Sequence, residues 1–109
     1  MFLKFSEQGF TSPVEGIALK SMAHGEKTHL VRFHLKGGCS LPWHSHPHEQ
    51  TGFLVSGKMT LTIGDQSHEV LPGDSWSIPG NVEHGAEIQE DSVAVEVFAP
   101  IRQDYLSEK

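Results

Sequence analysis

The sequence predicts an all-β fold, a sandwich or barrel built from short antiparallel strands. Apolar and polar residues alternate in several short runs along the chain, and glycine and proline turn signals separate these runs. No window shows the 3.6-residue apolar period of a convincing amphipathic helix. Many short, evenly spaced strands in 109 residues are typical of a sandwich or a closed barrel, and closure also removes exposed strand edges.

Four runs carry the clearest strand pattern. They cover residues 31–35, 58–63, 75–78 and 93–98. In the first three runs, apolar residues alternate with polar ones, which is the pattern of a strand with one buried face. The last run alternates three valines with Ala94, Glu96 and Phe98, so the pattern alone leaves open which of its faces is buried.

Turn signals lie between the predicted strands. They are Gly37-Gly38, Ser56-Gly57, Gly64-Asp65, Pro72-Gly73 and Pro79-Gly80-Asn81. The pair Gly64-Asp65 separates two strand-like runs, and a glycine in the first position of a two-residue loop predicts a type II′ hairpin. The stretch from residue 100 to residue 109 is the only one in which we expect a helical turn.

Composition limits the class of protein. The length fits one domain, residues 1–109, with a single core. A net charge of −6 argues against a nucleic-acid partner, which would need a positive surface. No segment approaches the roughly 20 apolar residues of a membrane span, and the N-terminus lacks a secretory signal. Cys39 is the only cysteine, so we expect a small buried or half-buried thiol and a cytoplasmic protein.

The segment from His44 to Gln50 reads His-Ser-His-Pro-His-Glu-Gln, and His84 follows the turn at 79–81. Residues two apart in a strand share a face, so the Cβ atoms of His44 and His46 would lie roughly 6–7 Å apart. Two imidazoles at that separation can bind one ion. Pro47 interrupts strand pairing and could bring Gln50 to the same ion. We therefore predict one divalent transition metal, held by His44, His46, Gln50 and His84.

Other side chains compete for these roles. Glu49 is next to Gln50, and in an extended segment only one of the two faces inward. His48 shares the face of His46 by alternation, although Pro47 weakens that argument. His68 is interpreted as a solvated side chain.

Two motifs resemble those of the cupins, and together they cover roughly residues 30 to 100. The motifs are Gly38-x5-His44-x-His46-x3-Gln50-x6-Gly57 and Gly73-x5-Pro79-x-Asn81-x2-His84. The resemblance implies a double-stranded β-helix, a jelly-roll barrel, with one metal inside its mouth. Gln50 stands where cupins usually have a glutamate ligand. Asn81 stands where they usually have glycine, and asparagine can still adopt the left-handed conformation of such a turn.

A narrower resemblance is to the small cupins of pectin and alginate breakdown, which linearise 4,5-unsaturated uronate monosaccharides. It rests on the segment 44–50 and on the ending Val97-Phe98-Ala-Pro100-x-Arg102-x-Asp-Tyr. It implies catalytic roles for Glu96, Phe98 and Arg102. Glu96 replaces the aspartate of those cupins, which moves the carboxylate by one methylene.

The residues themselves leave alternatives open for these three positions. Glu96 either lines the barrel as a general acid or base or is solvated on the outer face, opposite three core valines. Phe98 is either core or a platform for substrate. Arg102 either binds a substrate carboxylate or forms a surface ion pair with Asp104 or Glu108.

Three neutral imidazoles and a neutral amide leave the charge of a divalent metal uncompensated. Such an ion is a strong Lewis acid and attracts an anionic sugar. Nitrogen and oxygen ligands suit nickel, zinc, iron, cobalt or manganese.

Three functions follow as hypotheses. The first is a metal-dependent enzyme of the lyase or isomerase type that opens an unsaturated uronate. The second is a cupin-type dioxygenase, and the third is a non-catalytic barrel that binds metal or sugar. We also expect a homodimer, because runs 30–35 and 93–97 carry more apolar surface than one small interior absorbs.

Overall fold

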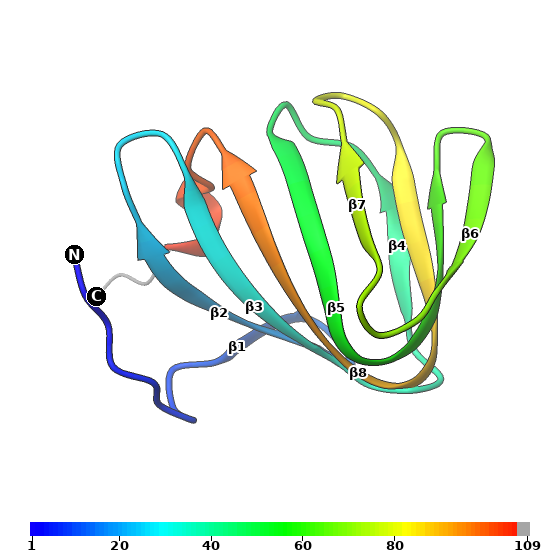
Figure 1. Ribbon diagram of the computed structural model, residues 1–109, viewed down its shortest axis with the longest axis horizontal. Coiled ribbons are helices and arrows are strands. Elements are labelled where there is room, and N and C mark those ends of the chain that lie inside the picture. The colour runs from blue at the N-terminus through cyan, green and yellow to red at the C-terminus, as the bar shows by residue number, and fades with distance from the viewer. Residues whose placement is uncertain (107–109) are drawn as a thin grey trace.

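The computed structural model describes residues 1–106, which form eight β-strands and one short 3₁₀ helix (Figure 1). The elements are β1 (Thr11–Val14), β2 (Ile17–His24), β3 (His29–Leu35), β4 (Ser40–His44), β5 (Glu49–Ile63), β6 (Gln66–Val70), β7 (Ser75–Ile78), β8 (His84–Ala99) and η1 (Gln103–Tyr105). The all-β prediction is confirmed, and η1 is a helical turn within the expected stretch, of which residues 107–109 lie outside the described part. No helix among residues 1–106 is long or apolar enough to cross a membrane.

Two long strands, β5 and β8, organise the sheet. They pair with each other along most of their lengths. The first part of β5 also pairs with β7 and its second part with β6. The first part of β8 pairs with β4 and its second part with β3, which continues to β2 and β1. Because β5 and β8 curve at the bottom of Figure 1, the sheet folds into two facing walls, as in a jelly roll.

The predicted turn at Ser56-Gly57 is wrong, because β5 continues through it. The pairing of β5 with β8 shifts register around these residues, as it does at a β-bulge. Gly57 has a φ of 100°, and a Cβ atom there would lie 2.0 Å from Oγ of Ser92. The glycine therefore bends one strand and does not end it.

The predicted hairpin at Gly64-Asp65 is confirmed. Ile63 pairs with Gln66, so the loop has two residues. Gly64 has a φ of 61°, whereas Asp65 has no positive φ. Positive φ at the first loop residue alone defines the type II′ turn.

The core lies between the two walls. Its buried members are Ile17, Leu19, Val31, Phe33, Leu35, Leu54, Met59, Leu61, Val70, Ala86, Ile88, Ala94 and Phe98. In β8, Ala94, Glu96 and Phe98 are buried and the three intervening valines are not. The alternative in which those valines form the core is therefore wrong. Phe33 pairs with Ala94 across the β3–β8 ladder, and paired residues share a face, so the apolar face of β3 determines which face of β8 is inside.

Candidate metal centre and cavity

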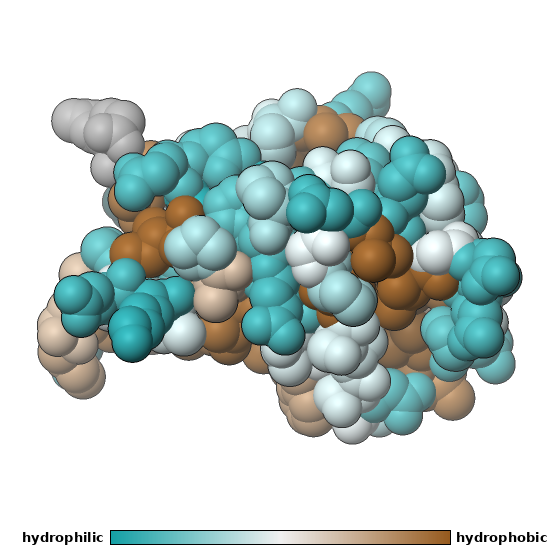
Figure 2. All heavy atoms as spheres, turned by 90° about the horizontal axis from the view of Figure 1, so that it is seen from above, coloured by the Kyte–Doolittle hydropathy of each residue, from teal (hydrophilic) through white to brown (hydrophobic). Residues whose placement is uncertain are grey.

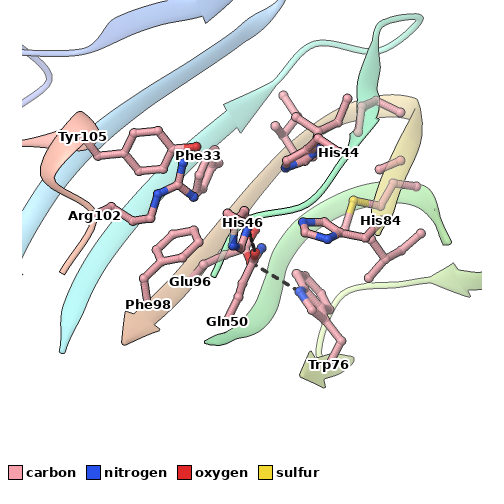
Figure 3. A pocket seen from close by; sticks show the side chains of 16 residues that line it. Phe33, His44, His46, Gln50, Trp76, His84, Glu96, Phe98, Arg102 and Tyr105 are labelled. Carbon is pink, nitrogen blue, oxygen red and sulfur yellow. Dashed lines mark hydrogen bonds between the residues drawn. The ribbon is translucent and has the colours of Figure 1, made fainter. Parts of the chain in front are cut away.

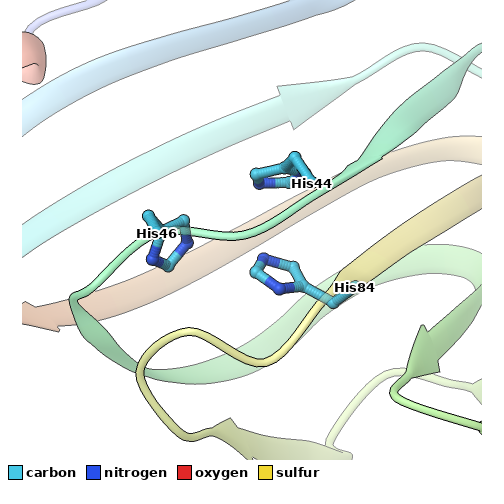
Figure 4. Close-up of side chains that lie close together, drawn as sticks. All are labelled: His44, His46 and His84. Atoms are coloured by element: carbon cyan, nitrogen blue, oxygen red, sulfur yellow. The ribbon is translucent and has the colours of Figure 1, made fainter.

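The three predicted histidine ligands come together at one end of the barrel (Figure 4). His44 ends β4 and His84 begins β8, and the two residues are directly paired across these strands. One ring nitrogen from each of His44, His46 and His84 lies within 4.8 Å of the others. The triad is therefore positioned to bind a metal ion.

The prediction that His46 continues a strand from His44 is wrong. β4 ends at His44, and His46 lies in the loop that leads to β5. The ring centroid of His46 nevertheless lies 5.6 Å from that of His44 and 5.0 Å from that of His84. The conformation of this loop places the His46 ring beside the rings of His44 and His84.

Each of the three rings is oriented by a backbone carbonyl two residues away. Nδ1 of His44 lies 2.7 Å from the carbonyl oxygen of Pro42, and Nδ1 of His84 lies 2.9 Å from that of Val82. Nδ1 of His46 lies 3.1 Å from the carbonyl oxygen of His48. A neutral ring that donates through Nδ1 keeps a lone pair on Nε2, which is the form that binds metal.

Gln50 approaches the triad from the start of β5. Its side chain is buried, whereas its neighbour Glu49 is exposed. Oε1 of Gln50 lies 3.0 Å from Nε2 of His46, and the amide nitrogen of Gln50 donates a hydrogen bond to Oε1 of Glu96. A glutamate at position 50 would instead bring two carboxylates together. This gives a physical reason for the glutamine.

The environment of His46 fits a bound cation. Its Nδ1 faces the carbonyl oxygen of His48 and its Nε2 faces Oε1 of Gln50, so both nitrogens face acceptors. A neutral imidazole has only one N–H to donate. Burial, the positive charge of Arg102 and the neighbouring imidazoles lower the pKa of His46 to about 4, so the ring is neutral at pH 7. A cation bound to Nε2 and Oε1 would satisfy both atoms.

His48 and His68 stand apart from the triad. In the part of the chain that the structure describes, the group of potential metal ligands contains His44, His46 and His84 alone. The His48 ring is half-buried with its centroid 5.6 Å from that of His46. His68 is exposed on β6.

Glu96 faces the interior, so the solvated alternative is wrong. Its side chain accepts hydrogen bonds from Gln50 and from the indole nitrogen of Trp76, which lies 3.3 Å from Oε1 (Figure 3). Burial raises the pKa of the carboxyl group, while these two hydrogen bonds and the charge of Arg102 act in the opposite direction. A buried carboxyl group beside a potential metal centre is suited to proton transfer.

Arg102 lies in the wall of the same cavity and is only 8% exposed. Its guanidinium carbon lies 4.9 Å from the ring centroid of Phe98 and 3.9 Å from that of Tyr105. Its Nε and one Nη donate to the carboxylate of Asp104 at 3.1 and 2.8 Å. The expected ion pair with Asp104 therefore forms, but on a buried arginine; Glu108 lies outside the described residues.

A second contact anchors the backbone of Arg102. Its N–H donates to Nδ1 of the fully buried His29 at 3.2 Å, and Nε2 of His29 lies 2.7 Å from Oγ of Ser21. Because Nδ1 accepts, Nε2 must carry the proton and donate it to Ser21. The C-terminal segment is thus attached to the barrel beside the cavity.

The cavity is lined by the triad, Gln50, Glu96, Arg102 and apolar side chains. Figure 2 views the molecule from the top of Figure 1, where hydrophilic residues predominate and hydrophobic ones show between them. Phe98 is 1% exposed and belongs to both the core and the cavity wall, so its predicted core role is confirmed, and its role as a platform for substrate stays a prediction. Tyr105 and Trp76 also line the cavity, which sequence reasoning did not anticipate.

The chain belongs to the cupin family, because a model of the cupin domain matches residues 31–99. The structure of KdgF from a Halomonas species is similar, with a TM-score of 0.90 and 29% identity over 97% of this chain and 98% of that one. An RmlC-like cupin from Shewanella frigidimarina has a TM-score of 0.88 and 23% identity over 94% of each chain, which supports the fold alone. These likenesses confirm the jelly-roll fold and the resemblance drawn from the motifs.

A curated relative matches a shorter region. The H2HPP isomerase of Bacillus subtilis is 35% identical over 57 residues, which are 50% of this chain. The match covers 24% of that protein, so this chain corresponds to only about a quarter of its length.

Proposed function

We propose that this cupin is a metal-dependent enzyme that linearises 4,5-unsaturated uronate monosaccharides. The observation that carries the proposal is the buried carboxyl group of Glu96, which lines the same cavity as the histidine triad and Arg102. The motif resemblance to small cupins of pectin and alginate breakdown supports it, as does the likeness to KdgF. The isomerase named among the relatives agrees with the reaction class.

His44, His46 and His84 would hold the metal through Nε2, and Gln50 through Oε1. Nitrogen and oxygen donors suit nickel, zinc, iron, cobalt or manganese. When bound, the ion supplies Lewis acidity to a hydroxyl or carbonyl oxygen. Because all four ligands are neutral, the ion's positive charge also favours an anionic sugar in the cavity.

Arg102 would bind the carboxylate of the sugar. Asp104 already occupies Nε and one Nη, and a guanidinium has five N–H groups in a planar fork. The remaining N–H groups are available for a second carboxylate. Phe98 and Tyr105 both pack against the guanidinium group, which strengthens its charge interactions by excluding water.

Linearisation is an isomerisation and needs no oxidant. The anomeric hydroxyl loses its proton, the bond between C1 and the ring oxygen breaks, and C1 becomes an aldehyde. The C4–C5 enolate that remains takes up a proton at C4 and becomes a ketone. Glu96 would remove the first proton and return one to C4, as a general base and then a general acid.

The test follows the absorbance of the C4–C5 double bond in monosaccharides released by a pectin or alginate lyase. The metal-loaded protein should remove it faster than the uncatalysed rate, with and without oxygen. Glu96→Gln should bind the sugar and lose turnover. Absence of any acceleration by fully metal-loaded protein would contradict the proposal, and dependence on oxygen would favour a dioxygenase.

We further propose that the protein is a cytoplasmic homodimer. Cys39 is a free thiol, which suits a reducing compartment. On the outer face, Leu30 pairs with Val97 and Phe53 with Val95, so apolar side chains form one continuous stripe. Phe53 is 44% exposed and Val97 37% exposed. A second copy covering this stripe would bury it.

Sedimentation velocity at micromolar concentration tests the dimer. The wild type should sediment as a dimer, and Phe53→Asp should sediment as a monomer. Leu71→Asp is the matched control, because Leu71 is 46% exposed but lies outside this stripe. A monomeric wild type would contradict the proposal.

A further inference from the structure

Three inward-facing residues form a row across three neighbouring strands. Gly52 of β5 pairs with Trp76 of β7 on one side and with Glu96 of β8 on the other. Directly paired residues point to the same face of a sheet. The side chains of Trp76 and Glu96 therefore flank a position that has no side chain.

The missing side chain allows the indole of Trp76 to cross β5. Strands two apart in a sheet are separated by about 9.6 Å, so Trp76 can reach Glu96 only by lying over Gly52. A Cβ atom at position 52 would lie 2.3 to 2.4 Å from Cε2, Cζ2 and Nε1 of the indole. Figure 3 shows the indole directed at the group formed by Gln50 and Glu96, and its Nε1 lies 3.3 Å from Oε1 of Glu96.

The two carboxylate oxygens of Glu96 differ in their hydrogen bonds. Oε1 accepts hydrogen bonds from both Gln50 and Trp76. Among residues 1–106, no hydrogen bond reaches Oε2. Two donors on one oxygen, approaching from two different strands, prevent the carboxylate from rotating.

We propose that Trp76 is a positioning residue for Glu96. Because Gly52 has no side chain, the indole can lie over it and donate its N–H to Oε1. Oε2 is then the oxygen that exchanges the proton with the substrate. This inference rests on the proposed function for the identity of the substrate. The arrangement of Trp76 and Glu96 is open to a test that needs no substrate.

The first test measures the indole N–H resonances of the zinc-loaded protein by NMR. The chain has two tryptophans, and Trp43→Phe assigns the remaining indole signal to Trp76. In Glu96→Ala, the Trp76 N–H signal should move upfield and exchange faster with solvent. In Glu96→Gln, where an amide oxygen still accepts, it should stay protected. An unchanged signal in Glu96→Ala would overturn the inference.

The second test removes only the N–H group. Benzothienylalanine at position 76 keeps the shape of tryptophan and has sulfur in place of N–H. This change and Trp76→Phe should each lower kcat by about tenfold, a part of the roughly 10²- to 10⁴-fold contribution of general acid–base catalysis. KM and bound zinc should change by less than about twofold. Wild-type kcat with benzothienylalanine would overturn the inference, because shape alone would then suffice.

Gly52→Ala tests whether the indole of Trp76 needs the space over Gly52, and Trp43→Phe is the control. The added methyl group should displace the Trp76 N–H signal and lower kcat, while Trp43→Phe, at a side chain that is 50% exposed, should leave kcat unchanged. A wild-type protein that does not open the uronate contradicts the proposed function. The indole signals would then still support or overturn the contact between Trp76 and Glu96.

Discussion

The backbone N–H of Asn81 donates a hydrogen bond of 2.7 Å to the carbonyl oxygen of His46. This bond joins the two motif segments next to the histidine triad, since His84 follows Asn81 by three residues. Asn81 has a φ of 69°, the left-handed conformation expected from the sequence. The relative position of the two ligand-bearing segments therefore depends on a turn that most residues disfavour.

Asn81→Ala should weaken both folding and metal binding. A left-handed conformation costs a residue other than glycine or asparagine roughly 1–2 kcal/mol. We expect a loss of about 1 kcal/mol in the free energy of unfolding and weaker zinc binding, because His46 loses its fixed neighbour. Urea unfolding and zinc titration measure the two effects. Asn81→Gly is the control and should behave like the wild type; equal loss in both variants would contradict the argument.

Metal binding should stabilise the fold. A ligand present at 100 times its Kd stabilises the native state by about 2.7 kcal/mol. Protein purified without an affinity tag should therefore unfold at a lower temperature after chelation. His84→Ala should abolish this difference and His68→Ala should retain it, because His68 is an exposed residue of β6. Metal analysis that finds equal metal in both variants would argue against the triad as the site.

The chelated protein should lose stability as the pH falls from 8 to 5. Burial lowers the pKa of His29, His46 and His84, and that of His46 reaches about 4. The native rings stay neutral while the unfolded chain takes up protons near pH 6.5. Each additional proton bound by the unfolded state costs about 1.4 kcal/mol per pH unit. The stabilising contribution is thus complete above pH 6.5 and declines below it.

A substitution of His29 tests the contribution of one of these buried histidines to the pH dependence of stability. Besides burial, its interactions with His24, Arg102 and His48 lower the pKa of His29 further, whereas the charge of Asp104 raises it. His29→Gln should show a shallower fall of unfolding free energy with decreasing pH than the wild type, measured by urea unfolding of chelated protein. His68→Gln should keep the wild-type slope. A slope for His29→Gln equal to that of the wild type would contradict the assignment.

Arg102→Lys should raise KM for the uronate by about tenfold or more. A lysine is a point charge and cannot bind a carboxylate through two parallel hydrogen bonds. Asp104→Asn should raise KM less, because Arg102 keeps its contacts with the rings of Phe98 and Tyr105 but loses part of its anchor. Gln103→Ala, an exposed change in the same segment, is the control. Initial-rate kinetics measure these values, and an unchanged KM in Arg102→Lys would exclude the carboxylate role.

The sequence predicts the fold class and the ligand-bearing segments well, since both depend on local signals. The hairpin at Gly64 follows from turn chemistry, and the triad follows from two motifs. The turn at Gly57 was predicted wrongly, because a glycine with positive φ serves a bulge as well as a turn. The outward orientation of Val93, Val95 and Val97 was undetermined, because alternation defines two faces without saying which one meets the core.

The cavity residues were harder to predict. The contact of Trp76 with Glu96 depends on two strand registers that meet at Gly52, and nothing local in the sequence sets those registers. Tyr105 lies in the segment whose backbone is attached to the barrel by the hydrogen bond from Arg102 to His29, 73 residues earlier in the chain. A pairing argument that aligned Gly52 with Trp76 would have found the first contact.

The carbonyl groups that orient His44, His46 and His84 each belong to a residue two positions away. For each of these three histidines, the carbonyl group that favours a proton on Nδ1 thus lies within the same three-residue segment. Apart from Oε1 of Gln50, which faces Nε2 of His46, no side chain among residues 1–106 hydrogen-bonds these three rings. Substitutions of the apolar wall residues that suit a different sugar would leave these carbonyl contacts in place, so sugar specificity and metal binding can change separately in this fold.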